Sequence, residues 1–324
     1  HRIAVMRVAL VGLGDAGRHH ARALAALSRE AVASWTAVVG RDAARLAGAR
    51  AELAVPDAVA SFASLDALLD ARVCDAVVLA TPDGVHAAQV ERAAAAGVHV
   101  LVEKPLALTR DDGARALEGA AAAGVRVRVG YHLRHHAAHA MVRARREELV
   151  GAVRHVSVQW AWPDPATSGW RARGEGARCW ALAALGTHAI DLAAWLGGAA
   201  VARVAAVLDR NDAGVDRAAD LSLALDSGAL AHVAVAVTHR AVSRVHLAGD
   251  AGEVELVGTL GARGTGEVRH RAGRGEPQAL AYEPVDPYLA QLRAFVAADA
   301  AEDEAHAAEA LANLDVLDRA ASSA

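Results

Sequence analysis

Apolar residues form short continuous runs in the first part of the chain. Five of these runs are typical of strands that are buried on both faces of a parallel sheet. They cover residues 7–11, 35–39, 73–80, 98–102 and 125–129. Stretches rich in alanine and leucine predict helices at residues 18–27, 43–53, 85–96 and 110–123. Because strands and helices alternate, we expect an α/β fold built on a doubly wound parallel sheet.

The pattern changes after residue 129. Two helical stretches are predicted, at residues 134–149 and 286–317. Between them, several runs alternate apolar and polar residues, as half-buried antiparallel strands do. These runs cover residues 153–160, 201–208, 221–225, 229–238, 245–247 and 253–257. We therefore expect two domains, 1–129 and 130–324, with no flexible linker between them.

Composition narrows the possible classes of protein. The chain has 324 residues, which suits two domains, and its 54% hydrophobic and 22% charged residues are typical of a globular protein. A net charge of -4 gives no electrostatic reason to expect nucleic acid or an anionic membrane as a partner. The sequence contains no apolar run of about 18 residues, so we expect no helix to cross a bilayer.

The cysteines and the opening residues bear on where the protein works. Cys74 and Cys179 are too few for a disulfide framework or a four-cysteine zinc site, which favours a reducing cytoplasm. The opening residues run directly into the first predicted strand, so we expect no signal peptide. Met6 is a candidate natural start.

The first predicted strand is followed by Gly12-Leu13-Gly14-Asp15-Ala16-Gly17 and then by a helix. In this position the G-x-G-x-x-G pattern is typical of dinucleotide binding. Gly12 permits the tight turn, Gly14 lets the backbone approach a pyrophosphate, and Gly17 lets the helix pack on the strand. A purely structural glycine turn is the alternative. We predict cofactor contacts at Gly12, Leu13, Gly14, Ala16 and Gly17.

The end of the second predicted strand bears on the choice of cofactor. An acidic residue there favours NAD, whereas a small residue followed by arginine leaves room and a counter-charge for the 2′-phosphate of NADP. Gly40 and Arg41 fill these two places, and Asp42 is placed to cap the next helix. We therefore expect NADP, with NAD possible. The alternative is that Arg41 is only a solvated surface residue.

Lysine and arginine together number 34, but Lys104 is the only lysine. Arginine stays charged, whereas a buried lysine amine can exchange a proton near neutral pH. Lys104 also follows a predicted buried strand, and ligands of doubly wound sheets bind at the carboxyl ends of the strands. These observations make Lys104 a candidate for proton chemistry. A chance survivor of a codon bias toward arginine is the alternative.

Several segments together carry a family resemblance. They are the glycine turn; Thr81-Pro82-x-x-x-His86; Ala96 to Pro105, which includes Glu103-Lys104-Pro105; Gly130-Tyr131-x-x-Arg134; Gly186-Thr187-His188-Ala189-Ile190-Asp191; and Asp286-Pro287-Tyr288 with Gln291 and Phe295. In their order and spacing the chain resembles the Gfo/Idh/MocA oxidoreductases over nearly its whole length.

The resemblance implies a Rossmann domain followed by an α/β domain with an open, mostly antiparallel sheet, through which copies of the chain associate. It implies an NAD(P)-dependent oxidoreductase that moves a hydride between nicotinamide and a hydroxyl or carbonyl carbon of a sugar-like or related small molecule. Lys104 matches the lysine of the family, and His188 its catalytic histidine or tyrosine. By the same resemblance we expect Thr81, Pro82, His86, Glu103 and Lys104 beside the cofactor.

The chain departs from the family pattern at Ala184, where many members carry an aspartate four residues before the histidine. Asp164, Glu175 and Asp191 are candidate substitutes. The departure puts the usual sugar or polyol specificity in doubt. It also keeps open an alternative function, a dinucleotide-binding sensor or assembly subunit without catalysis.

The remaining candidates are substrate contacts. Tyr131 and Arg134 follow the last Rossmann strand, and for Arg134 a simple salt bridge is the alternative. Aromatic residues near Trp160 suit a sugar ring or nicotinamide, although we expect at least two of Trp160, Trp162, Trp170 and Trp180 to be core. Arg171 and Arg173 suit an anionic substrate. We also include Thr187. His132, His135, His136 and His139 recur at helical spacing, but we expect no metal there.

Overall fold

The computed structural model describes residues 5–163, 170–175, 177, 179–297 and 300–322. It divides into two compact units. The first combines His1–Gly130 with Tyr288–Leu311, and the second combines Tyr131–Pro287 with Ala312–Ala324. None of the described helices is both long enough and apolar enough to cross a membrane.

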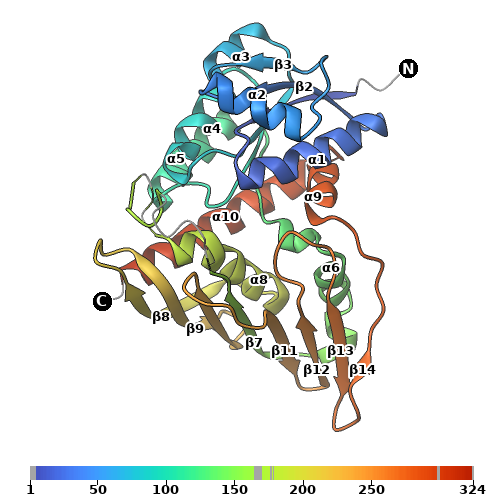
Figure 1. Ribbon diagram of the computed structural model, residues 1–324. Coiled ribbons are helices and arrows are strands. Elements are labelled where there is room, and N and C mark those ends of the chain that lie inside the picture. The colour runs from blue at the N-terminus through green and yellow to red at the C-terminus, as the bar shows by residue number, and fades with distance from the viewer. Residues whose placement is uncertain (1–4, 164–169, 176, 178, 298–299, 323–324) are drawn as a thin grey trace. The chain divides into compact units, whose positions relative to one another are not determined.

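The first unit is built on a six-stranded parallel sheet in the order β3-β2-β1-β4-β5-β6. Figure 1 labels β2 and β3 of this sheet together with the helices of the unit. Its strands are β1 (Met6–Val11), β2 (Ala33–Val39), β3 (Ala60–Phe62), β4 (Ala76–Leu79), β5 (His99–Val102) and β6 (Val127–Val129). Strands β1, β4 and β5 contribute fully buried valine, leucine and alanine residues to the core. The predicted doubly wound parallel sheet is confirmed.

Helices connect these strands. They are α1 (Asp15–Arg29), α2 (Ala43–Glu52), α3 (Leu65–Ala71), the short η1 (Asp83–Val85), α4 (His86–Ala95) and α5 (Arg110–Ala122). The Asp42 carboxylate accepts the backbone N–H of Arg45 at 2.9 Å, so the predicted cap of α2 is confirmed. Strand β3 and helix α3 are absent from the sequence prediction because β3 is a three-residue edge strand without a buried residue.

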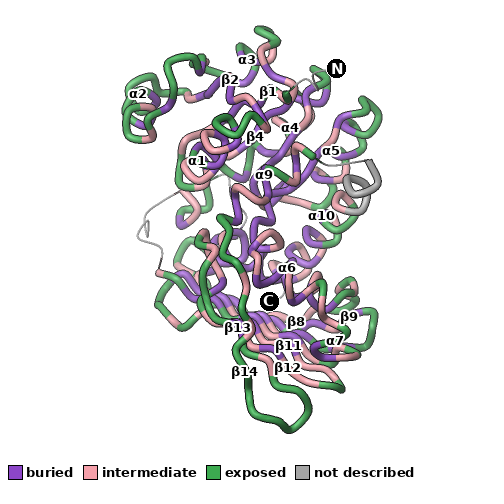
Figure 2. Tube along the Cα trace, turned by 90° about the vertical axis from the view of Figure 1, so that its right-hand side faces the viewer, coloured by how far each residue is buried: buried purple, intermediate pink, exposed green. Residues whose placement is uncertain are grey.

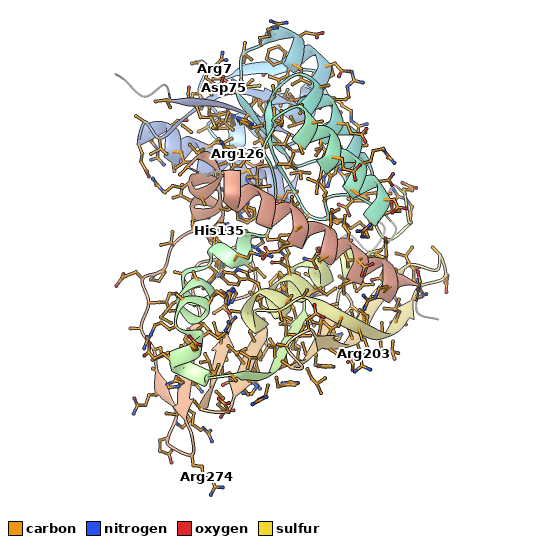
Figure 3. The ribbon with its side chains drawn as sticks, turned by 180° about the vertical axis from the view of Figure 1, so that it is seen from behind. Arg7, Asp75, Arg126, His135, Arg203 and Arg274 are labelled. Carbon is orange, nitrogen blue, oxygen red and sulfur yellow. The ribbon has the colours of Figure 1, made fainter. Side chains whose placement is uncertain are left out.

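The chain returns to the first unit near its C-terminus through α9 (Pro287–Ala297) and the first part of α10 (Ala300–Ala321). The Arg126 guanidinium donates to the Phe295 carbonyl at 2.7 Å. Arg126 is labelled beside these helices in Figure 3. The Val129 N–H donates to Nε2 of His306 at 2.9 Å. The first unit is therefore completed by residues that lie far apart in the sequence.

The second unit is built on an eight-stranded sheet in the order β14-β13-β12-β11-β7-β10-β9-β8. Its strands are β7 (Val153–Ala161), β8 (Val201–Arg210), β9 (Asp216–Leu225), β10 (Leu230–Ala236), β11 (Arg244–Gly249), β12 (Gly252–Val257), β13 (Glu267–Ala272) and β14 (Gln278–Ala279). Among the described strands of this second sheet, only the pairing of β7 with β10 is parallel. The sheet is therefore mostly antiparallel, as expected. Burial follows the alternation in β7, where Val156 and Val158 are buried between more exposed neighbours. At the end of the same sheet β14 is exposed (Figure 2).

The helical part of the second unit differs from the prediction of one helix at residues 134–149. The structure has η2 (His132–His135), α6 (Ala137–Ala144) and α7 (Arg146–Val150) instead. His136 adopts an extended backbone, and its ring accepts the Ala138 N–H at 3.2 Å, so the residue caps α6 rather than continuing a helix. Further on, a π-helical turn η3 (Leu182–Gly186) leads into α8 (Thr187–Gly197), which packs on β7 and β10.

Candidate functional site

The glycine turn lies between β1 and α1. Gly12 has a φ of +95°, and a Cβ there would lie 2.4 Å from the Ala80 carbonyl oxygen. A Cβ on Gly17 would lie 2.2 Å from the Gly12 carbonyl oxygen. Both positions therefore require glycine for the strand–turn–helix to close as tightly as it does.

Gly14 plays a different part because it is the N-cap residue of α1. A Cβ at Gly14 would have no neighbouring atom within 4 Å. Among the described residues no side chain caps this helix. The backbone N–H groups of the first helical turn are thus accessible at the positive end of the helix dipole. This arrangement fits the pyrophosphate of a dinucleotide.

The end of β2 presents Gly40 and Arg41. A Cβ at Gly40 would lie 3.2 Å from the Leu46 side chain, so the packing of α2 favours a small residue here. Arg41 is exposed, and Asp42 is engaged as the cap of α2. Gly40 and Arg41 are therefore the residues of this strand end that could lie beside the adenosine ribose of a dinucleotide.

His86 joins the ends of β4 and β5. Its Nδ1 lies 2.7 Å from the Pro105 carbonyl oxygen, and its Nε2 lies 2.8 Å from the Thr81 carbonyl oxygen. The ring is fully buried, and the Thr81 hydroxyl in turn donates to Gln89 at 2.6 Å. His86 therefore fixes the loops that carry Thr81 and Lys104, while its own ring nitrogens face backbone oxygens.

Glu103 and Lys104 follow directly after β5. Glu103 is 5% exposed, and its carboxylate lies 2.7 Å from Nε2 of His20 on α1. Lys104 is half-buried at the carboxyl end of the sheet, two strands away from the glycine turn at β1. The strand order reverses direction at β1, which is where doubly wound sheets bind ligands.

His188 lies in the second unit, on the first turn of α8. It is 2% exposed, and its ring centroid lies 4.6 Å from that of His132, 6.1 Å from that of Trp160 and 6.3 Å from that of Tyr131. The preceding π-helical turn places α8, and π-helical turns are frequent at functional sites. Asp216 on β9 caps this turn: its carboxylate accepts the N–H groups of Trp180 and Leu182 at 2.8 and 2.7 Å.

Tyr131 and Arg134 lie beside α8 in the same unit. Arg134 makes a bidentate ion pair with Asp191, with N–O distances of 2.8 and 2.5 Å, and is 12% exposed. Asn313 donates to the same carboxylate at 3.1 Å. Burial, and then the Asp191 charge, raise the pKa of Tyr131, so its phenol stays protonated at neutral pH. Sequence reasoning did not include Asn313, which no motif marks.

The tryptophans divide between core and surface. Trp160 and Trp180 are buried, which confirms that at least two belong to the core, whereas Trp162 is half-exposed. The Arg171 guanidinium lies over the Trp170 ring at 4.4 Å, and Arg173 pairs with Glu175 at 2.6 Å. Thr187 is buried at the start of α8. Of the candidate carboxylates near Ala184, Asp164 lies outside the described residues, and Glu175 and Asp191 are each paired with an arginine.

The histidines of η2 and α6 hold a loop between β12 and β13. His132 and His136 lie 3.2 and 3.3 Å from the carbonyl oxygens of Gly261 and Thr265. His139 is fully buried, with Nδ1 at 2.8 Å from the Leu133 carbonyl oxygen and Nε2 at 2.9 Å from the Thr259 hydroxyl. Within the described part of the chain, no group of three or more His, Cys, Asp or Glu side chains is arranged to hold a metal ion.

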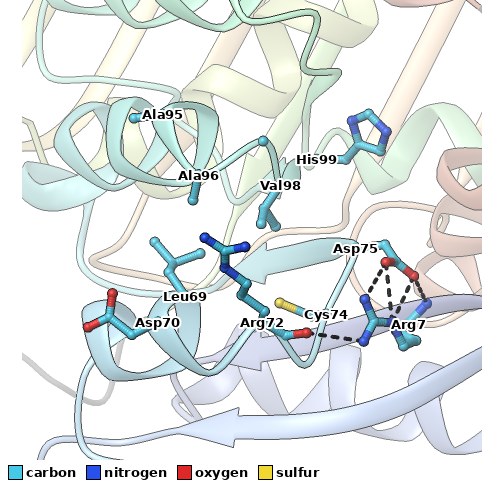
Figure 4. A pocket seen from close by; sticks show the side chains of 11 residues that line it. Arg7, Leu69, Asp70, Arg72, Cys74, Asp75, Ala95, Ala96, Val98 and His99 are labelled. Carbon is cyan, nitrogen blue, oxygen red and sulfur yellow. Dashed lines mark hydrogen bonds and ion pairs between the residues drawn. The ribbon is translucent and has the colours of Figure 1, made fainter.

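A cavity of about 590 Å³ opens in the first unit at the amino-terminal ends of the strands, away from the carboxyl ends that carry the glycine turn and Lys104 (Figure 4). Arg7, Asp75 and His99 line it at the amino-terminal ends of β1, β4 and β5, and Arg7 is paired with Asp75 at 2.7 Å. Ligands of doubly wound sheets bind at the carboxyl ends of the strands, so we do not place the site here. Cys74 also lines the cavity, but it is 6% exposed and burial raises its pKa to about 11, so it is a buried thiol and not a reactive one.

Comparison with known proteins gives the class to which these features belong. Residues 6–131 match a family described as "Oxidoreductase family, NAD-binding Rossmann fold", and residues 136–261 match the "GFO/IDH/MocA C-terminal domain". The chain belongs to the Gfo/Idh/MocA oxidoreductase family, as its motifs predicted. Its first unit is an NAD-binding Rossmann domain.

Individual relatives fall in the same family. The chain is 32% identical over 201 residues to D-xylose 1-dehydrogenase (NADP(+)) 2 of Haloferax volcanii, which covers 61% of this chain and 60% of that protein. It is 32% identical over 281 residues to a putative UDP-kanosamine synthase oxidoreductase subunit of Amycolatopsis mediterranei, which covers 79% and 76%. The chain spans 57% to 61% of the length of the first curated relatives that it matches.

A solved structure extends the likeness to the whole chain. The aldose-aldose oxidoreductase of Caulobacter crescentus is similar with a TM-score of 0.86 and 25% sequence identity, and the match covers 98% of each chain. The relatives are named dehydrogenases, reductases and oxidoreductases, and most of these names refer to sugars or sugar nucleotides. The chain is thus related to NAD(P)-dependent enzymes of sugar chemistry.

Proposed function

We propose that the protein is an NADP(H)-dependent oxidoreductase that transfers a hydride between nicotinamide and a hydroxyl or carbonyl carbon of a sugar-like small molecule. The observation that carries this proposal is the place of Lys104. The only lysine of the chain follows the carboxyl end of β5, and the glycine turn follows the carboxyl end of β1 in the same parallel sheet. The first unit binds the dinucleotide, and the second unit supplies substrate contacts; the sequence prediction of domains 1–129 and 130–324 did not include the return of Tyr288–Leu311 to the first unit.

The residues of the first unit fit the cofactor. When bound, a nicotinamide dinucleotide accepts or donates the hydride. The uncapped amides at Gly14 hold the pyrophosphate, with Leu13 and Ala16 beside it, and Arg41 pairs with the 2′-phosphate. Thr81, Pro82 and Glu103 line the same edge, on loops that His86 fixes. A relative named for NADP(+) supports the choice of phosphate-bearing cofactor.

Lys104 and His188 supply the proton chemistry. An alcohol loses its O–H proton as the hydride leaves, and a ketone gains a proton as the hydride arrives. The Lys104 ammonium stabilises the developing alkoxide and exchanges the proton. The imidazole of His188 can accept and donate a proton, which suits a group that passes the proton onward. Tyr131, Arg134, Trp160, Trp170, Arg171 and Thr187 are the candidates for contacts with the substrate.

Substitution of Lys104 tests the proposal. The purified protein is titrated with NADPH and NADH, then assayed with sugars, polyols and keto compounds by nicotinamide absorbance. Lys104→Arg keeps the positive charge but cannot release a proton, so we expect unchanged NADPH affinity and at least about 10²-fold lower turnover. Arg274→Lys, at an exposed turn, is the matched control and keeps full turnover. Full turnover in Lys104→Arg would refute the proton role.

A second candidate function is favoured by Ala184. The helical turn before His188 lacks the carboxylate that many family members carry, which suits a dinucleotide-binding protein without catalysis. Tight binding of NADPH with no turnover of any compound in the screen would support it. Failure to bind either dinucleotide would exclude both functions.

Self-association through the sheet of the second unit is part of the proposal. Val207 on β8 is 76% exposed and Leu230 on β10 is 58% exposed, which is unusual for strand residues of this kind. Light scattering is expected to give a mass of at least two chains. Val207→Asp together with Leu230→Asp should shift that mass toward one chain, and an unchanged mass would place the interface elsewhere.

A further inference from the structure

A buried pair joins the helix after the glycine turn to the strand that ends at the lysine. Nε2 of His20 on α1 lies 2.7 Å from a carboxylate oxygen of Glu103. His20 is 0% exposed and Glu103 is 5% exposed. A carboxylate accepts hydrogen bonds, so the imidazole donates here. A buried hydrogen bond to a carboxylate contributes more than the same bond on a surface, so loss of this donor is expected to disturb the position of the carboxylate.

The same carboxylate also reaches the backbone of the next residue. The Lys104 N–H donates to the other oxygen of Glu103 at 3.3 Å, and the Glu103 N–H donates to the Leu79 carbonyl oxygen on β4 at 2.8 Å. Glu103 is therefore held at both its main chain and its side chain. The direction in which the chain leaves β5, and with it the origin of the Lys104 side chain, depends on this carboxylate.

Close packing leaves the pair little freedom. A Cβ on Gly130 would lie 3.0 Å from a Glu103 oxygen, so the glycine makes room for the carboxylate. Tyr288 of α9 packs against His20 edge to face, with ring centroids 5.0 Å apart. Gly17 and His20 are three residues apart on α1 and thus share the helix face that packs on the sheet. One helix face therefore carries both the tight glycine packing and the hold on Glu103.

We propose that His20 is a positioning residue that acts through Glu103 to orient Lys104. It also couples Lys104 to the glycine turn, because α1 begins at that turn. This inference rests on the proposed function, in which Lys104 moves the proton. It adds a residue that none of the motifs of the sequence analysis contains.

Kinetics of two His20 variants test the role. His20→Leu fills similar space without a donor, whereas His20→Gln keeps an N–H that can reach the carboxylate. We expect His20→Leu to lose about 10²-fold in kcat with little change in the KM for the sugar-like substrate, since misplacement of a reacting group by about 1 Å has an effect of this size. His20→Gln should recover most of the rate. His19→Leu, which removes the neighbouring imidazole stacked on Tyr288, is the matched control and should stay near wild type.

A second measurement does not require turnover. Reductive methylation with ¹³C-formaldehyde labels Lys104 as the only lysine, and its NMR signal is distinguished from that of the N-terminal amine by the Lys104→Arg variant. We expect the Lys104 signal to move in His20→Leu and in Glu103→Gln, and to overlay wild type in His20→Gln and His19→Leu. An unmoved signal in His20→Leu and Glu103→Gln would overturn the positioning role even if Lys104 proves essential. A moved signal without turnover in any variant would contradict the proposed reaction alone.

Discussion

The carboxylate of Asp216 on β9 accepts the backbone N–H of Leu182, at 2.7 Å, where the π-helical turn before His188 begins. The same carboxylate accepts the Trp180 N–H at 2.8 Å. Asp216 is 1% exposed, and burial raises its pKa although these two bonds oppose the shift. A single buried side chain thus organises the segment that carries His188.

We expect Asp216→Ala to lower the free energy of unfolding by about 2 to 3 kcal/mol, because two N–H groups lose a charged acceptor. Asp216→Asn keeps one acceptor oxygen and should lose less. Urea denaturation measures both changes, and Asp212→Ala, at an exposed position, serves as the control. Wild-type stability in Asp216→Ala would show that the turn does not depend on this cap.

The pH dependence of stability should follow His139. Burial lowers its pKa to about 3 in the folded protein, from an ordinary value of 6.5. Between these pH values the unfolded chain binds a proton that the folded chain does not. The free energy of unfolding therefore falls as the pH drops from 6.5 toward 3, by about 1.4 kcal/mol per pH unit from this residue.

Urea denaturation between pH 4 and pH 7.5 measures this slope. His139→Gln should show a shallower loss of stability below pH 6.5, whereas the exposed His239→Gln should follow wild type. Burial also lowers the pKa of His136, which adds to the wild-type slope in the same direction. Equal slopes in wild type and His139→Gln would contradict the assignment.

Cofactor preference should depend on Arg41. Its removal takes away the counter-charge of a 2′-phosphate but leaves contacts to the rest of the dinucleotide. We expect Arg41→Ala to weaken NADPH binding about tenfold, or roughly 1.4 kcal/mol, and to leave NADH binding unchanged. Titration by nicotinamide fluorescence measures both affinities, with Arg274→Ala as the control. Tighter binding of NADH than NADPH in wild type would reverse the assigned preference.

Two alanine substitutions in the glycine turn should separate folding from binding. Gly17→Ala places a methyl group 2.2 Å from the Gly12 carbonyl oxygen, so we expect a loss of about 1 to 3 kcal/mol in stability. Gly14→Ala meets open space and should fold as wild type, while the methyl group hinders a pyrophosphate at the helix end. Denaturation and NADPH titration of both variants check this, and undiminished NADPH affinity in Gly14→Ala would argue against pyrophosphate binding there.

The elements that could be predicted from the sequence are those in which apolar residues mark the buried positions. The apolar runs of β1, β4 and β5 are unambiguous because parallel strands are covered on both faces. Strand β13 was missed because it is mostly exposed and polar, with Val268 as its buried position and arginine at 269 and 271. The break of the helix at His136 was missed because the apolar residues keep their helical spacing on both sides of it. The cap that its ring provides for α6 leaves no mark in that spacing.

Site residues follow the same division. The positions of the glycine turn after β1 and of Lys104 after β5 could be predicted because both follow apolar runs that are typical of buried strands, and their roles stay predictions. His20, Asp216 and Asn313 act through contacts between segments that are far apart in the sequence, which a local pattern does not contain. For His20 one indication was present, since it lies three residues after Gly17 and so on the same face of α1.

The return of Tyr288–Leu311 to the first unit has a consequence for how this protein is made and divided. A ribosome releases β6, the last strand of the Rossmann sheet, long before it releases α9 and α10, whose Phe295 and His306 contact Arg126 and Val129. Arg126 and Val129 therefore cannot form these contacts until the late helices have been synthesised. Likewise, a single cut in the chain cannot separate the two units, because any one cut leaves the nucleotide-binding unit without part of its covering.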